Sequence, residues 1–176
     1  MSLLIRSSAP KPGPATALGA VALGAVALGT VTFGGTEPAA APPDAAPIGA
    51  TVFAERCAVC HGPQAAGIPG SFPPLHGQVA AFVKIPQGRD YLVMVVTTGL
   101  MGSLAVGGAN YNGVMPAQSG LSEAEVAAVL SYLASDMGKA DSGAAPLSAN
   151  EVREARTRHP EKSAQATRAL RPAADP

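Results

Sequence analysis

Cys57-Ala58-Val59-Cys60-His61 is the stretch of this sequence from which the rest of the chain is best interpreted. Two cysteines separated by two residues and followed directly by a histidine form the pattern of a c-type haem attachment site. On a helical turn, residues three and four positions apart lie on one face, so both thiols and the imidazole point the same way. The thiols can form thioethers with the two vinyl groups of a haem, and the imidazole can then bind its iron.

The cysteine count supports one haem c, covalently attached through Cys57 and Cys60. The chain has 2 cysteines, and both lie in this stretch. A structural zinc site usually takes four Cys or His ligands, and the sequence has no second pair of cysteines. A thioredoxin-like redox pair is expected near a βαβ pattern, which the sequence does not show. A metal site and a redox dithiol are the alternatives to haem attachment.

Length and composition predict one small domain with tails. The chain has 176 residues, with 12 basic and 12 acidic side chains, so it has no basic excess of the kind that predicts nucleic-acid binding. Tryptophan is absent and aromatic residues make up 4% of the chain. A small domain with few large apolar side chains buries little surface on its own. A haem would supply the missing apolar centre.

Residues 1–36 are predicted to be a signal peptide or a membrane anchor. Ala15–Gly35 contains no charged residue in 21 positions, and Arg6 and Lys11 precede it. This length suits a membrane span of about 20 residues and exceeds the roughly 7–15 apolar residues in the core of a signal peptide. Residues 39–41 are all alanine, however, and could form a signal-peptide cleavage site. The preceding positive charges keep the N-terminus inside. The rest is therefore expected on the periplasmic side of the bacterial inner membrane, anchored or soluble.

The remaining chain divides into a linker, a helical domain and a tail. Residues 37–48 are rich in proline and alanine and predict an extended linker. An all-α haem domain is predicted over residues 49–137, with Ser122 and Glu125 forming a capping box at the start of its last helix. Residues 138–176 are predicted to be a linker, a short helix at 148–158 and a flexible tail. Within the haem domain, helices are predicted at 49–60, 78–83, 88–98 and 122–136, with glycine-rich and proline-rich loops at 62–77 and 100–113.

The sixth iron ligand has several candidates. They are Met94, Met101, Met115, Met137, His76 and His159. Met115 is favoured because it lies in a Gly/Pro loop directly before the last helix of the domain, where its side chain can reach the distal face of a haem. Met101 is the second candidate, and Met94 is expected to fill the core of a helix face.

Other side chains are expected near the haem. A backbone carbonyl of the Pro73-Pro74 region is predicted to accept a hydrogen bond from the second ring nitrogen of His61, as is usual for metal-binding histidines. Arg89 or Lys84 is a candidate partner of a haem propionate, with a solvated surface charge as the alternative. Tyr111 is a third candidate, with packing against the haem as its alternative.

Five motifs within about Gly49–Asp136 resemble class I, single-haem c-type cytochromes, close to the cytochrome domains of cbb3-type oxidases and membrane dehydrogenases. The motifs are Cys57-x-x-Cys60-His61-Gly62, Gly67-x-Pro69-Gly70-x-Phe72-Pro73-Pro74-Leu75-x-Gly77, Gly99-x-x-Gly102, Tyr111-Asn112-Gly113-x-Met115-Pro116-Ala117 and Leu121-Ser122-x-x-Glu125-Val126. The resemblance implies a cytochrome c fold, in which three main helices and long loops surround one haem, preceded here by the N-terminal hydrophobic helix.

The same resemblance implies His61 and Met115 as the axial iron ligands. It also implies that the first and last helices cross, which would bring Phe53 near Tyr132 or Leu133. His76 is a departure, because relatives of this type commonly have a small residue there.

The ligand set indicates a function. A six-coordinate iron held by histidine and methionine has no open position for a substrate, and it can change charge by one electron without exchanging ligands. The sequence therefore predicts an electron-transfer protein and not an enzyme, acting alone or as the cytochrome subunit of a respiratory dehydrogenase or terminal oxidase. Redox partners are expected to dock weakly at the haem edge. Two alternatives stay open: a haem-based enzyme or gas sensor with an open or labile sixth position, and a structural tether in which the haem is incidental.

Overall fold

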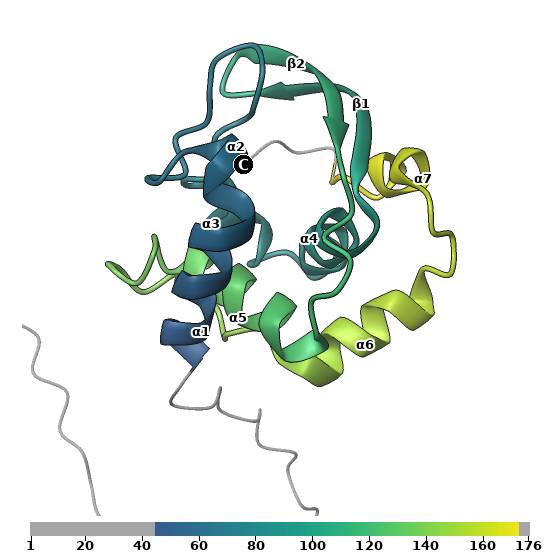
Figure 1. Cartoon of the computed structure of the whole chain (residues 1–176). Coiled ribbons are helices and arrows are strands. Elements are labelled where there is room, and N and C mark those ends of the chain that lie inside the picture. The colour runs from purple at the N-terminus through teal and green to yellow at the C-terminus, as the bar shows by residue number, and fades with distance from the viewer. Residues whose placement is uncertain (1–44, 173–176) are drawn as a thin grey trace, which may run out of the picture. The chain divides into compact units, whose positions relative to one another are not determined.

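The computed structural model describes residues 45–172, and Figure 1 shows how their helices and strands are arranged. The predicted hydrophobic helix of residues 15–35, its cleavage site and most of the linker lie outside the described residues. Within residues 45–172, no helix has both the length and the apolar character needed to cross a membrane.

The first helix leads without interruption into the Cys-x-x-Cys-His stretch. It consists of α1 (Ala45–Val52), a π-helical segment η1 (Phe53–Cys57) and α2 (Ala58–His61). A single π-helical turn inside an α-helix often marks a functional site, and here it ends at the first cysteine. The predicted helix is confirmed, and its start lies four residues earlier than expected.

The first helix crosses α5 (Glu123–Ala134), as the sequence motifs implied. At the crossing, the buried Gly49 lies so close to α5 that a Cβ atom on it would be 2.7 Å from Tyr132 Cβ. The rings of Phe53 and Tyr132 are 6.1 Å apart. The implied contact between Phe53 and Tyr132 is therefore confirmed, and the absence of a side chain at Gly49 permits it.

Capping and apolar periodicity explain why α5 forms where the sequence predicts it. Ser122 accepts a hydrogen bond from the Glu125 backbone N–H, and the Glu125 side chain accepts one from the Ser122 backbone N–H, so the predicted capping box is confirmed. Val126, Val129 and Leu130 are almost fully buried and lie on one face. They pack against α3 (Gln78–Phe82) and α4 (Pro86–Thr98), both close to their predicted ranges.

A two-stranded hairpin replaces the loop predicted at residues 100–113. Strands β1 (Leu100–Val106) and β2 (Ala109–Met115) pair antiparallel, with Leu100 opposite Met115 and Val106 opposite Ala109. Gly107 and Gly108 both have positive φ angles, as a tight two-residue hairpin turn requires. The sequence predicted a purely helical domain, and this prediction is wrong in one respect. The helical core has a two-stranded hairpin added to it (Figure 1).

The C-terminal region is also more ordered than expected. Ser148 accepts a hydrogen bond from the Glu151 backbone and begins α6 (Ala149–Arg158), the predicted short helix. A further helix, α7 (Ala164–Ala169), follows in the segment that was expected to be flexible. It lies beside β1 and α4 (Figure 1). We call residues 149–171 the C-terminal cap.

Candidate haem site

One large apolar cavity brings together the residues predicted to bind haem. It has a volume of about 400 Å³, and its walls include Cys57, Cys60, His61 and Met115. Ligand sites in proteins generally measure about 300–1,000 Å³ and have mostly apolar walls with a few polar groups. The apolar side chains that line this cavity include Leu75, Val79, Phe82, Leu92, Val95, Val96, Leu104, Val129, Leu130 and Leu133.

The imidazole of His61 is held in one orientation by the backbone. Its Nδ1 lies 2.8 Å from the carbonyl oxygen of Pro73, in the region predicted from the sequence. A carbonyl only accepts hydrogen bonds, so Nδ1 carries the hydrogen in this contact and Nε2 of the neutral ring keeps a free lone pair. Burial lowers the pKa of His61 from its ordinary 6.5, while the hydrogen bond to Pro73 opposes this shift. Both the orientation and the neutral form suit an iron ligand.

The loop between His61 and α3 places the Pro73 carbonyl. The Gly67 backbone N–H donates to the His61 carbonyl at 2.8 Å, and Ile68 pairs with Phe72 in an isolated bridge. The Phe72 ring lies edge-on to His61, with 6.3 Å between the ring centroids. The predicted irregular loop is therefore confirmed, and its contacts hold one side of the His61 imidazole in place.

The environment of Cys57 does not suit a redox thiol. Burial, with a smaller effect from Cys60, raises the pKa of Cys57 to about 11. Reactive thiols in redox motifs have lowered pKa values, because the thiolate is the nucleophile. Both cysteines are free of disulfides and line the same cavity. This geometry favours the haem interpretation of the stretch over the redox dithiol.

Met115 reaches the cavity because it ends β2. Its backbone pairs with Leu100 at the open end of the hairpin, and the Gln118 N–H donates to the Val96 carbonyl at 2.8 Å. These contacts fasten the Met115 segment to the end of α4. His61 and Met115 come from segments far apart in the sequence and line the same cavity.

The other candidates for the sixth ligand lie elsewhere. The side chain of Met101 is exposed on β1, and Met137 follows α5 outside the cavity walls. His76 pairs with Asp136 on the surface at 2.7 Å. Of the six candidates, all of which lie within the described residues, Met115 is the one that lines the large cavity.

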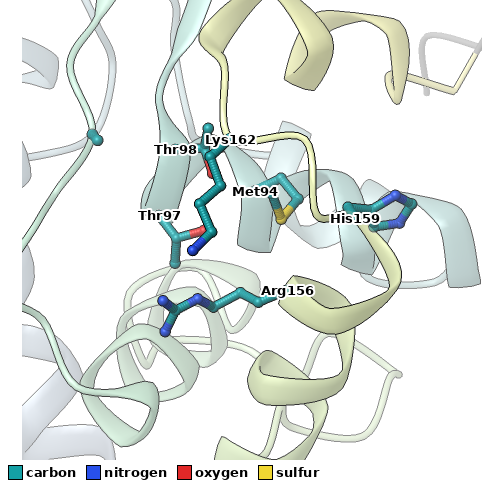
Figure 2. Close-up of a pocket in the computed structure, with 7 residues that line it drawn as sticks. Met94, Thr97, Thr98, Arg156, His159 and Lys162 are labelled. Atoms are coloured by element: carbon teal, nitrogen blue, oxygen red, sulfur yellow. The ribbon is translucent and has the colours of Figure 1, made fainter.

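Met94 and His159 line a second, smaller hollow of about 150 Å³, which Figure 2 shows together with Thr97, Arg156 and Lys162. None of the four predicted haem-binding residues lines this hollow. His159 falls in the segment that was predicted to be a flexible tail, but it lies 2.9 Å from the Asp90 carboxylate of α4. Met94 is buried in α4, as predicted for a core residue.

The predicted propionate partners differ in their surroundings. Arg89 pairs with Glu151 of α6, with 2.9 Å between Nη2 and Oε2, and does not line the cavity. Lys84 is exposed and also lies outside the cavity walls. Tyr111 is buried and lines the cavity beside Leu104 and Val106.

Arg171 is a cavity residue that the sequence analysis missed. Its guanidinium carbon lies 5.1 Å from the centroid of the Phe82 ring, and both residues line the cavity. No local pattern marks this arginine, because its contacts depend on how the C-terminal cap folds back onto α3 and α4.

The cavity fits a covalently attached haem. Two thiols, an oriented imidazole and a thioether face one apolar space, which is the donor set of a c-type haem with histidine and methionine nearby. The site therefore defines a haem protein of the covalent, c-type class. When bound, the haem supplies an iron that changes its charge by one electron.

Comparison with protein families gives the same class. Residues 46–136 match the family described as "Cytochrome c". The chain therefore belongs to the cytochrome c family, binds haem c covalently and serves haem-based electron transfer.

The chain is also similar to two proteins called cytochrome c-552. One comes from Thermus thermophilus; it is 43% identical over 112 residues, which cover 62% of this chain and 85% of the relative. The other comes from a particular strain of the same species and is again 43% identical over 112 residues, covering 62% of this chain and 75% of the relative.

Proposed function

We propose that this protein is a one-electron carrier whose haem iron is held by His61 Nε2 on one side and Met115 Sδ on the other. The observation that carries the proposal is that the oriented imidazole and the methionine line the same cavity. With both axial positions filled, the iron has no site for a substrate, and electron exchange needs no change of ligands.

Absorption spectra of the matured holoprotein test the ligand assignment. The ferric protein is expected to show the weak sulfur-to-iron charge-transfer band in the red, and the ferrous spectrum is expected to change little under CO. Met115→Ala should lose the red band and bind CO readily. Met101→Ala is the matched control and should keep both properties.

The same spectra separate this proposal from a haem-based enzyme or gas sensor. Rapid and complete CO binding by the unaltered ferrous protein would show an open or labile sixth position. The carrier proposal would then fail, even though the haem itself remained attached.

We place the domain on the periplasmic side of the bacterial inner membrane, either anchored by residues 1–36 or released after cleavage. The uncharged stretch Ala15–Gly35 and the preceding Arg6 and Lys11 support this proposal. Haem-stained gels of soluble and detergent-extracted fractions test it. A pigmented band in the membrane fraction indicates the anchor, a shorter band in the periplasmic fraction indicates cleavage, and a band only in the cytoplasm contradicts the proposal.

The partner is proposed to be a redox protein of a respiratory dehydrogenase or terminal oxidase, including the cbb3 type. Val59 and Val114 line the cavity and are also 80% and 64% exposed, so they form apolar surface at its rim. Such surface suits a small, transient contact of under about 1,200 Å². Val59→Asp should slow electron transfer to solubilised membranes, while Ile48→Asp, an exposed position on α1, should not.

A further inference from the structure

The C-terminal cap is fastened to the helical core at two places. Near its start, Glu151 pairs with Arg89 of α4, and at the end of α6 Arg158 Nη2 donates to Asp90 at 2.7 Å. Farther along, the Arg168 Nε–H donates to the Ser103 carbonyl of β1 at 2.8 Å. These contacts fix the path of α7 and carry the following residues to the rim of the haem cavity.

Arg171 lies at that rim, against two aromatic rings. Its guanidinium carbon is 5.1 Å from the Phe82 centroid and 5.9 Å from the Tyr91 centroid. Its Nη2 donates to the Ala105 carbonyl at 3.2 Å. Phe82 and Tyr91 are each 2% exposed, and they line the cavity with Arg171. A guanidinium stacked on aromatic faces is well held, and its five N–H donors allow it to bind an oxyanion in addition to its protein partners.

The cavity wall is short of charge elsewhere. Among the described residues, the guanidinium groups that line it belong to Arg56 and Arg171, and no carboxylate lines it. Arg56 is exposed on the attachment helix, and its charge acts on Glu125 at the start of α5. Arg171 is half-buried and packs on the cavity's own aromatic rings. Of these two cations, Arg171 is therefore the better placed to meet an anion inside the cavity.

We propose that Arg171 holds a propionate of the bound haem, so that the C-terminal cap is part of the haem site. Haem carries two carboxylates, and placing one against an apolar wall is costly unless a cation or hydrogen-bond donors meet it. The charge-assisted bond expected between guanidinium and carboxylate is of the strong kind. This inference rests on the presence of the haem but not on the identity of the sixth ligand.

The reduction potential tests this proposal in the matured holoprotein. Arg171→Gln removes a positive charge near the haem and leaves the propionate uncompensated, which favours the more positive ferric state. Its midpoint potential is expected to fall relative to the wild type, and Arg171→Lys is expected to recover part of the loss. Lys162→Gln is the matched control, because it removes an exposed cation of the same cap that lies outside the haem cavity, and its potential is expected to stay unchanged.

The outcomes are distinct. An unchanged potential in Arg171→Gln would overturn the proposal. Equal falls in Arg171→Gln and Lys162→Gln would also overturn it, because the effect would then come from the net charge of the cap and not from the position of Arg171 at the cavity. Retention of the red charge-transfer band in every variant shows that the axial ligands are intact, so failure of this inference is distinguished from failure of the ligand assignment.

A second measurement tests the proposed contact between Arg171 and the haem propionate directly. In ¹⁵N-labelled holoprotein, the Arg171 Nε–H is expected to exchange slowly with water and to change its NMR shift between ferric and ferrous states. The Arg168 Nε–H should change much less, because it lies farther from the cavity. Equal changes for both arginines would contradict the proposal.

Discussion

At the scale of single residues, the backbone oxygen of Pro73 decides how the imidazole of His61 is presented. The 2.8 Å contact between that oxygen and Nδ1 fixes the tautomer and the ring plane, so Nε2 keeps the free lone pair that the proposed bond to iron requires. The oxygen stays in place because the chain packs closely around Gly67, which has a φ angle of +71°.

Gly67→Ala is therefore expected to disturb the site. A Cβ atom there would lie 2.8 Å from the Pro73 oxygen and would collide with the Phe72 carbonyl, so the loop must move. Gly70→Ala is the control, because Gly70 also has a positive φ angle of +75° but a Cβ atom there meets nothing within 4 Å. We expect Gly67→Ala to lower the free energy of unfolding by about 1–3 kcal/mol more than Gly70→Ala. Equal losses in denaturant titrations would show that the close packing at Gly67 is unimportant.

At the scale of elements, the crossing of the first helix and α5 depends on the small size of Gly49. In an exposed helix, alanine stabilises by about 1 kcal/mol relative to glycine. At Gly49 a Cβ atom would collide with the Ala128 carbonyl and lie 2.7 Å from Tyr132 Cβ. Gly49→Ala should therefore destabilise the protein by about 1–3 kcal/mol. Thermal unfolding measures the change, and a stability gain near the helix-propensity value would contradict the close crossing.

The contact between α4 and α6 is expected to depend on pH. A hydrogen bond from Arg158 holds the pKa of Asp90 below its ordinary 3.8, with a further contribution from His159, while burial opposes the shift. Because the folded-state pKa is the lower one, the stabilisation is fully present above the unfolded pKa and is lost as the pH falls through the folded value. At neutral pH, Asp90→Asn should cost about 1 kcal/mol.

Unfolding of Asp90→Asn and the wild type across the acid range tests this prediction. The difference between them should disappear below the folded-state pKa of Asp90. Glu154→Gln is the control, since it removes the exposed second partner of Arg158 and is expected to change stability by less than about 0.5 kcal/mol. A difference for Asp90→Asn that is constant at all pH values would contradict the assignment.

Local patterns predicted some elements and failed for others. The α5 capping box was predictable because all of its contacts lie within four residues. The hairpin was missed because its glycines were interpreted as loop residues, although Gly107-Gly108 between alternating apolar residues is itself a hairpin signal. Arg171 was not predictable, because Tyr91, with which it bonds, lies 80 positions away in the sequence.

At the scale of the whole molecule, α2, α3, α4, α5, both strands of the hairpin and Arg171 of the cap contribute to the wall of one apolar cavity of about 400 Å³. Protein interiors are normally close-packed, so the fold is expected to need the haem to fill this space. The Cys-x-x-Cys-His stretch alone predicted the cofactor, whereas the shape of the cavity depends on segments that are distant in the sequence.

Loss of the haem is therefore expected to loosen the whole described domain. Cys57→Ala/Cys60→Ala should lack covalent haem and show a broadened thermal transition at lower temperature by circular dichroism. Val59→Ala, between the two cysteines and 80% exposed, should keep the haem and unfold like the wild type. A haem-free double variant that unfolds as cooperatively and at the same temperature as the holoprotein would contradict this account and support the tether alternative.

The central claim is that one haem, attached at Cys57 and Cys60, is bound by His61 and Met115. Proton NMR of the ferrous holoprotein tests it most directly, because the ring current of the porphyrin strongly shifts a methyl group that lies over the iron. We expect one upfield methionine methyl signal in the wild type that is absent from Met115→Leu and present in Met101→Leu. A wild-type spectrum without such a signal, or one that persists in Met115→Leu, would contradict the assignment of Met115.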